Sequence, residues 1–244
     1  MIGKVVVVED EAAGLSLARK ILYQTVDRNT VLFLSGGKTP KPLYETLAKE
    51  GKLKPKAVGM VDERLDRSNL EMIKGTGLLN HFKNLGVNFY PIISDAAAYD
   101  KYIHSLFASC KNKVAIMGIG EDGHTAGLPA SPKLQRGEPP GISNFQFPRP
   151  TSPASELAGG RAISNNEDLV IYINNFPGEF KERITLTFRA LSEMDLLIVL
   201  AFGSAKQNAL TSMFKEGSLE EIPARFYTKP EIAKKTILIT DQKV

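Results

Sequence analysis

The chain has 244 residues, of which 43% are hydrophobic and 24% are charged, and this composition is typical of a globular protein with a buried core. Its formal charge of +4 is modest and no basic block carries interleaved aromatic residues, so we expect no nucleic-acid partner. No apolar run approaches the ~20 residues of a membrane span. The single cysteine, Cys110, excludes an internal disulfide and is expected to be a buried structural thiol. Because the apolar start is also too short for a signal peptide, we expect a cytoplasmic protein.

Apolar runs typical of buried strands alternate with segments of helical periodicity. The expected strands are residues 5–8, 31–34, 57–61, 114–117, 169–173, 196–200 and 236–239. The expected helices are residues 11–23, 41–49, 96–110 and 205–215. Near-continuous apolar strands separated by helices predict an α/β fold with a mostly parallel sheet covered on both faces.

A glycine turn, Ser35-Gly-Gly-Lys-Thr-Pro40, follows the second expected strand and precedes a helix. Thr39 is predicted to be the N-cap and Pro40 the first helical residue. A strand, a glycine turn and a helix N-terminus together favour an anion site, because free N–H groups and the helix dipole point into the turn. The alternative is that the two glycines merely permit a tight turn.

The third expected strand ends in Asp62-Glu-Arg64. Two carboxylates beside an arginine at the exit of a strand can hold hydroxyl groups and an anionic group of a ligand. On its own, the same cluster is equally typical of a solvated loop of ion pairs.

The fourth strand ends in Gly118-Ile-Gly-Glu-Asp-Gly-His124, which contains one of only three histidines in the chain. His124 is predicted to lie at the carboxyl edge of the sheet, where open α/β folds bind their ligands. It is therefore a candidate general base, although a loop cap or a polar plug remains an alternative. Residues 129–160, rich in Pro, Ser and Gly, follow directly, and we favour a mobile flap over a linker for them.

Two cations complete the candidates. Arg183 precedes an alternating apolar run that is typical of a strand or of a helix entry, and it can act either as a bidentate phosphate clamp or as an ordinary surface arginine. Lys206 follows Gly203-Ser-Ala in the first turn of an expected helix. A lysine there opposes the helix dipole unless an anion shares the site, which favours Lys206 as a ligand of that anion.

These segments, with Ser68-Asn69, Thr125-Ala126 and Ile184-Thr-Leu-Thr187, occur in an order that resembles the 6-phosphogluconolactonase family, in the superfamily shared with glucosamine-6-phosphate deaminase. The resemblance covers roughly residues 5–240 and implies a single three-layer, modified Rossmann-like domain over residues 1–244. It implies hydrolysis of 6-phospho-D-glucono-1,5-lactone in the pentose phosphate pathway, without a cofactor or a metal. The expected partner is this phosphosugar lactone, and the expected state is a monomer or a weak homodimer.

The resemblance also implies roles for individual residues. His124 is the general base that acts on water, and Asp62 orients sugar hydroxyls or the imidazole. The substrate is held by Ser35, Gly36, Gly37, Lys38, Thr39, Arg64, Gly120, Asp122, Gly123, Arg183 and Lys206.

The sequence departs from the family pattern around the expected substrate site. Lys38 replaces a serine, the loop after Arg64 is shorter, and Phe176-Pro-Gly-Glu-Phe-Lys181 replaces a Lys-Pro-Pro element. One alternative is deaminase or isomerase chemistry with Asp62 as the enolising base, but residues 125–129 offer no carboxylate for it. Another is a phosphosugar-sensing protein without activity, although such a protein is expected to have lost its catalytic groups.

Overall fold

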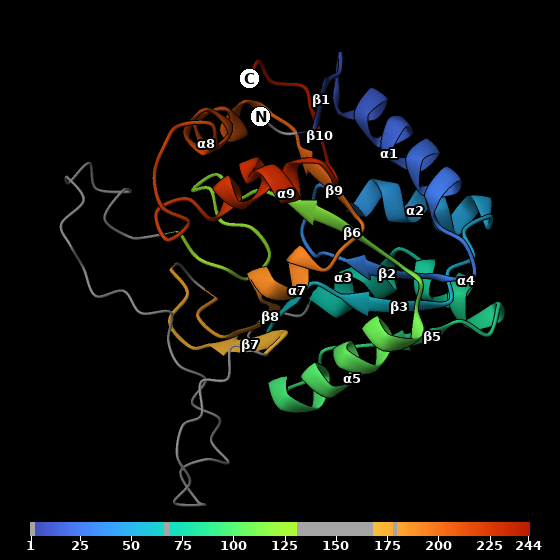
Figure 1. Cartoon of the computed structure of the whole chain (residues 1–244). Helices are drawn as coiled ribbons and strands as arrows, with labels where there is room; N and C mark the ends of the chain where they lie inside the picture. Colours follow the sequence, from blue (N-terminus) through green and yellow to red (C-terminus); the bar gives the residue numbers. More distant parts are fainter. Residues whose placement is uncertain (1–2, 66–68, 131–167, 178–179) are drawn as a thin grey trace, which may run out of the picture.

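The computed structural model describes residues 3–65, 69–130, 168–177 and 180–244. Its central feature is a seven-stranded sheet in the order β1-β10-β9-β6-β2-β3-β5, in which every neighbouring pair runs parallel (Figure 1). These strands are β1 (Lys4–Val7), β2 (Thr30–Leu34), β3 (Ala57–Met60), β5 (Asn88–Tyr90), β6 (Asn112–Gly118), β9 (Leu196–Ala201) and β10 (Thr236–Thr240). The prediction of an α/β fold with a mostly parallel sheet is confirmed.

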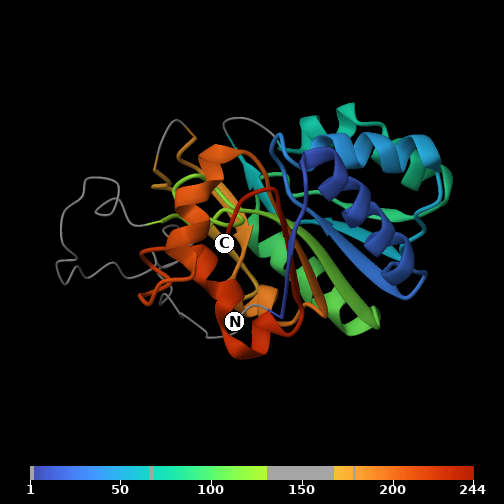
Figure 2. The ribbon, with the colours of Figure 1, turned by 90° about the horizontal axis from the view of Figure 1, so that it is seen from above.

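Helices cover both faces of this sheet, as Figure 2 shows from above. The α-helices are α1 (Glu11–Thr25), α2 (Lys41–Glu50), α3 (Asn69–Gly75), α4 (Leu78–Asn84), α5 (Ala96–Ser109), α7 (Phe188–Ser192), α8 (Gln207–Met213) and α9 (Pro230–Ala233). Two 3₁₀ helices are η2 (Ser204–Lys206) and η3 (Pro223–Thr228). Helices α1, α2 and α4 pack on one another on one face, while α5 lies on the other. In the part of the chain described, no helix is both long and apolar enough to cross a membrane.

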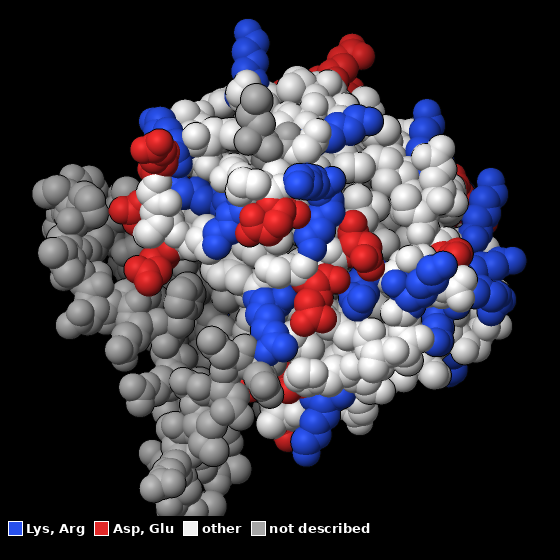
Figure 3. Space-filling view, in the orientation of Figure 1, with Lys and Arg blue, Asp and Glu red and all other residues white. Residues whose placement is uncertain are grey.

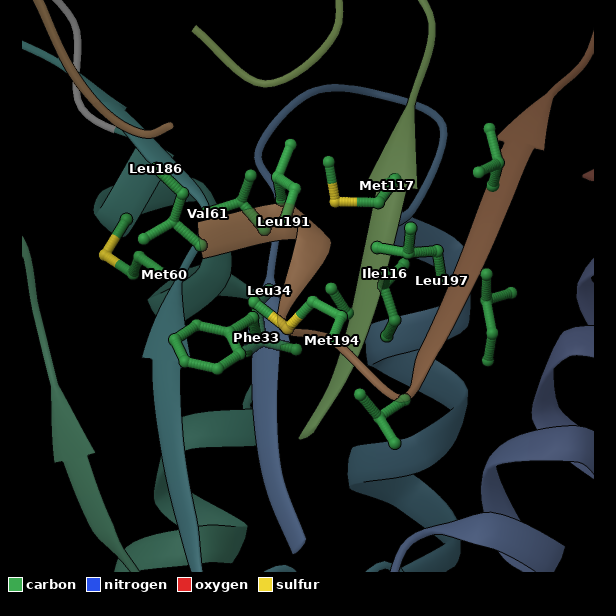
Figure 4. Close-up of a cluster of buried hydrophobic side chains, with 14 of the residues drawn as sticks. Phe33, Leu34, Met60, Val61, Ile116, Met117, Leu186, Leu191, Met194 and Leu197 are labelled. Carbon is green, nitrogen blue, oxygen red and sulfur yellow. The ribbon is translucent and has the colours of Figure 1, made fainter. Parts of the chain in front are cut away.

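The central strands carry continuous apolar runs because helices cover both of their faces, although β6 begins with the polar residues Asn112 and Lys113. Every residue of β2 is buried, including Phe33 and Leu34. Figure 4 shows Leu34, Ile116 of β6 and Leu197 of β9 in one cluster with Leu191 of α7. This rigid core fixes the ends of the strands from which the functional loops leave.

A second, three-stranded sheet was not expected from the sequence. It consists of β4 (Asp62–Arg64), β8 (Arg183–Leu186) and β7 (Val170–Ile173), in the antiparallel order β4-β8-β7. The expected strand 57–61 therefore ends at Met60, and the chain turns at Val61 into this second sheet. Arg64 lies directly opposite Arg183 in the register of β4 and β8.

The central sheet reverses its strand order between β2 and β6. From β2 the chain continues through β3 to β5 on one side, and from β6 it continues through β9 and β10 on the other. Ligands of open α/β sheets bind outside the carboxyl ends of the strands at such a switch point. The turn after β2 and the loop after β6 both leave from this point.

Most expected elements are present within two residues of their predicted ends, but several details were wrong. Helix α2 begins at Lys41, so Pro40 is the N-cap and Thr39 does not cap the helix. Lys206 ends η2 and is the N-cap of α8, so it precedes the α-helix that was expected to begin at residue 205. Of the proposed flap, residues 131–160 lie outside the described part of the chain.

Candidate active site

The loop after β6 folds back on itself and presents His124. The N–H of Gly120 donates to the carbonyl of His124 at 2.8 Å, and the N–H of Gly123 donates to the carbonyl of Gly120 at 3.1 Å. Gly123 has a φ of 87°, which strongly favours glycine at this turn. His124 thus lies in the loop that leaves the carboxyl end of β6, the edge of the sheet at which the sequence placed it, and this edge is also the switch point.

His124 is paired with a carboxylate from its own loop. Its Nδ1 lies 2.5 Å from Oδ1 of Asp122, which also accepts the N–H of His124 at 3.1 Å. Burial opposes ionisation of Asp122, but these hydrogen bonds from His124 hold the pKa of the carboxyl below its ordinary value. Because an ionised carboxylate only accepts, the pair favours the tautomer with the proton on Nδ1 and leaves Nε2 as a proton acceptor. Asp122 is therefore the residue that can orient the imidazole.

Helix η3 and the residue before it support this loop from behind. The N–H of Ala224 donates to the carbonyl of Gly123 at 3.0 Å, and the side chain of Ile222 lies against Gly123. The hydroxyl of Tyr227 lies 2.5 Å from Oγ1 of Thr125, which donates to the carbonyl of Gly118 at 2.9 Å. The residues on both sides of His124 are thus held by the same short segment, a contribution that the sequence did not indicate.

Asp62 lies in the second sheet and is almost fully buried. Its Oδ2 is 3.2 Å from Nδ2 of Asn69 and 3.8 Å from a terminal nitrogen of Arg183. Burial raises the pKa of Asp62, while Arg183, Arg64 and His124 act in the opposite direction. Four predicted site residues therefore lie close enough to influence one another electrostatically.

Glu63, by contrast, serves the backbone. Its carboxylate accepts the N–H of Arg64 at 2.8 Å, that of Leu70 at 2.9 Å and that of Asn69, so it satisfies the free N-terminal donors of α3. Its partners among the backbone N–H groups indicate a structural role for this carboxylate. A Cβ on Gly36 would lie 2.1 Å from the side chain of Asn69, so the glycine turn packs directly against the first residue of α3.

The glycine turn after β2 presents residues of different exposure. Ser35 is buried, and its carbonyl accepts the hydroxyl of Tyr44 at 3.0 Å. Gly37 has a φ of 95° and open space around its α-carbon, whereas Lys38 is exposed. The turn is therefore anchored by Ser35 and open at Gly37, as an anion-binding turn requires.

The two predicted cations occupy different settings. Lys206 is half-buried; burial lowers its pKa, while the charges of Glu121 and Asp122 act in the opposite direction. It therefore lies beside the His124 loop. Arg183 is almost fully buried, with a side-chain exposure of 7%. Arg64 is more accessible, and its Nε has no hydrogen-bond partner among the residues that the structure describes.

Two phenylalanines that were not candidates contact the cationic side of the site. The guanidinium carbon of Arg183 lies 3.6 Å from the ring centroid of Phe176, and that of Arg64 lies 5.4 Å from the ring centroid of Phe180. Phe176 also contacts His124, with the ring centroids 5.3 Å apart. Only the three-dimensional structure reveals these contacts, because nothing in the local pattern of residues 176–180 indicates them.

Charge outside the loops is mixed. On the face seen in Figure 3, basic and acidic side chains are interspersed over the described surface. Within the described ranges, no group of three or more His, Cys, Asp or Glu side chains is arranged to hold a metal ion. The cationic side chains near the candidate site are Lys38, Arg64, Arg183 and Lys206.

The fold and these loops define a class, namely a parallel α/β enzyme with a histidine–carboxylate pair at the switch point of its sheet. The model of one family, described as glucosamine-6-phosphate isomerases/6-phosphogluconolactonase, matches residues 10–237. The chain belongs to this family.

Relatives with this fold are known from several bacteria. The chain is 31% identical over 205 residues to a 6-phosphogluconolactonase of Xylella fastidiosa, covering 80% of this chain and 75% of the relative. It is 27% identical over 237 residues to one of Synechocystis, covering 88% and 85%. The crystal structure of a 6-phosphogluconolactonase from Thermotoga maritima matches with a TM-score of 0.65 at 24% identity, covering 97% and 98%. That structural likeness establishes the fold.

Proposed function

We propose that this chain hydrolyses 6-phospho-D-glucono-1,5-lactone to 6-phosphogluconate, with His124 as the general base. The observation that carries the proposal is the 2.5 Å contact between Nδ1 of His124 and Asp122 at the switch point, with Lys206 and Asp62 nearby. The names of the relatives supply the reaction, because the curated relatives described above are named 6-phosphogluconolactonase.

In the proposed mechanism the carboxylate of Asp122 accepts a hydrogen bond from Nδ1–H of His124, so Nε2 is free to take a proton from water. The oxygen of that water attacks the lactone carbonyl and forms a tetrahedral intermediate. The bond between the carbonyl carbon and the ring oxygen then breaks, and the imidazolium returns its proton to the ring oxygen. The products are the carboxylic acid and the free sugar hydroxyl, so no cofactor is consumed.

The phosphate group of the substrate is proposed to lie between the glycine turn and the cations. Backbone N–H groups of residues 35–39 and the side chains of Lys38, Arg64 and Lys206 supply donors for it, and charge-assisted hydrogen bonds of this kind are roughly twice as strong as neutral ones. Arg183 is almost fully buried and close to Asp62. It is therefore proposed to attract the phosphate through its charge, from a position deeper in the protein than the donors of Lys38, Arg64 and Lys206. Asp62 is proposed to hold Arg183 and Asn69 in place.

The direct test is an assay of the purified chain with freshly prepared 6-phosphogluconolactone beside glucosamine 6-phosphate. Spontaneous hydrolysis of the lactone must be subtracted. We expect hydrolysis of the lactone and no release of ammonia from the amino sugar. Turnover of glucosamine 6-phosphate alone would assign the chain to the deaminase branch, and binding of both compounds without turnover would indicate a sensor.

A further inference from the structure

Phe176 stands between the proposed base and the buried arginine. One face of its ring lies 3.6 Å from the guanidinium carbon of Arg183. Its ring also meets the imidazole of His124 at an interplanar angle of 89°, with the centroids 5.3 Å apart. The side chain is buried, and the N–H of Phe176 donates to the carbonyl of Lys181 at 2.9 Å. The residue is thus fixed at its backbone and touches two site residues with different roles.

The contact with Arg183 restricts how this arginine can act. A guanidinium has its five N–H donors in one plane. A ring that packs on the face of this plane therefore leaves only the edge of the plane for hydrogen bonds to a ligand. Arg183 also lies directly opposite Arg64, a juxtaposition of like charges that destabilises an antiparallel pair. The stacked ring partly offsets this repulsion, because the face of an aromatic ring attracts a cation.

The contact with His124 restricts the base in the same way. Asp122 fixes one edge of the imidazole through Nδ1, and the ring of Phe176 meets it at nearly a right angle. Edge-to-face packing of two rings is a favoured geometry. Rotation of the imidazole away from this orientation would break both contacts.

We propose that Phe176 is a positioning residue that fixes the plane of Arg183 and the orientation of His124 relative to each other. This inference rests on the proposed function, since it assumes that His124 acts on a substrate whose anionic group is attracted by Arg183. The substrate class that this arrangement fits is a sugar lactone in which a fixed distance separates the phosphate from the carbonyl carbon. Phe176 sets the distance between Arg183 and His124 because its single rigid ring spans the space between these two side chains.

The decisive variant is Phe176→Leu, which keeps an apolar side chain in the buried space but removes the ring. We expect kcat with the phosphorylated lactone to fall about 10- to 100-fold, because a misplacement of about 1 Å at a reacting group can have that effect. The preference over unphosphorylated gluconolactone should fall as well. Phe176→Tyr keeps the ring and should retain kcat within a few fold.

The matched control is Phe82→Leu. Phe82 is fully buried in α4 and its ring centroid lies 5.5 Å from that of His81, so it has the same type of neighbour outside the site. This variant should lose stability without changing kcat or the preference for the phosphorylated lactone. It separates the loss of a buried ring from the loss of positioning.

The geometry can be tested without turnover, because the chain has only three histidines and their ring signals can be resolved by NMR. Phe176→Leu should shift the ring C–H signals of His124 and leave those of His81 and His104 in place. Phe82→Leu should shift those of His81 instead. Isothermal titration with 6-phosphogluconate should show weaker binding by Phe176→Leu than by the wild type and by Phe82→Leu.

The inference is overturned if Phe176→Leu keeps the kcat and the product affinity of the wild type, or if its His124 signals do not move. A folded Phe176→Tyr whose kcat is as low as that of Phe176→Leu would also overturn it. A wild-type chain that does not hydrolyse the lactone contradicts the proposed function alone. In that case the NMR shifts and the titration still decide whether Phe176 positions the two side chains.

Discussion

Gly120 lies so close to His124 that a Cβ at this position would be 2.0 Å from Nδ1 of the imidazole and 2.5 Å from Oδ1 of Asp122. The absence of a side chain at position 120 thus provides the space in which the histidine–carboxylate pair forms. Gly120→Ala should displace the imidazole and lower kcat at least ~10²-fold, which is the typical contribution of a general base. Steady-state kinetics of the folded variant measure this. Gly75→Ala is the control, since a Cβ there meets nothing within 4 Å, and equal activity of the two variants would contradict the prediction.

Replacement of the base itself should have the same kinetic signature. His124→Asn is expected to lower kcat at least ~10²-fold and to leave KM within a few fold, because the role proposed for the imidazole is to act on water and not on the phosphate. The rate must be corrected for spontaneous hydrolysis. His104→Asn, on the exposed side of α5, should match the wild type. A folded His124→Asn with normal turnover would remove His124 from the proposed role.

Asp62→Asn should make stability less dependent on pH. Burial raises the pKa of Asp62 in the folded protein, so the carboxyl favours folding while it is protonated. This contribution is complete below the ordinary carboxyl pKa of about 4 and is lost as the pH rises through the folded value. An asparagine stays neutral, so the free energy of unfolding of the variant should improve relative to the wild type as the pH rises above about 4.

Urea denaturation at several pH values measures this difference. Asp27→Asn is a control of opposite sign, because hydrogen bonds, first of all from the backbone of Asn29, lower the pKa of Asp27. That variant should lose stability relative to the wild type as the pH rises toward about 4, and the difference should stay constant at higher pH. A constant difference between Asp62→Asn and the wild type at all pH values would show that Asp62 titrates as an ordinary carboxyl.

Lys206→Ala should chiefly weaken the binding of phosphorylated ligands. Loss of a charge-assisted contact costs about 1.5–3 kcal/mol, whereas unphosphorylated gluconolactone should be nearly indifferent to the change. Burial lowers the pKa of Lys206, so in the wild type the affinity for 6-phosphogluconate should fall at a lower alkaline pH than an ordinary lysine would allow. Lys215→Ala removes the same charge from an exposed position and should not change the affinity. Equal losses with both substrates would contradict the phosphate assignment.

Tyr227→Phe should affect turnover through the support of the His124 loop. The variant loses the 2.5 Å contact with Thr125, and we expect kcat to fall while KM stays constant. The free energy of unfolding should fall by about 1 kcal/mol, the net contribution of one hydrogen bond. Tyr23→Phe removes an equally short contact, between Tyr23 of α1 and Glu50 of α2, outside the site. This variant should change stability without changing kcat. If the two variants had the same kcat, η3 would support the fold but not the base.

The sequence predicts best those elements whose residues are buried on every side. The strands β2, β6 and β9 contain the continuous apolar runs 31–34, 114–117 and 196–200, and the glycines after β6 mark the turn that presents His124. The position of the histidine could therefore be predicted. The short helices α3 and α4 were missed although Leu70 and Ile73, and then Leu78 and Phe82, recur at helical spacing.

The second sheet could not be predicted because its strand β4 is the charged triplet Asp62–Arg64. Such a segment is typical of a loop until β8 provides its partner, and in that setting Asp62 and Glu63 become buried. The role of Glu63 as the cap of α3 depends on the same packing. Phe176 and Tyr227 contact the site from distant parts of the chain, so no local sequence pattern indicates their contacts.

The route of the chain divides the site into two parts. Between the loop of His124 and β9 the chain forms β7, β8 and α7, an excursion whose described strands belong to the second sheet and not to the main sheet. His124 and Lys206 are carried by the main sheet, whereas Arg183 and Phe176 are carried by the excursion or by its connections. Excursion residues other than Phe176, whose ring contacts His124, can therefore be substituted while η3 still supports the loop of His124. Evolution of new substrate preferences in this family should leave its marks in the excursion before it reaches the loop of His124.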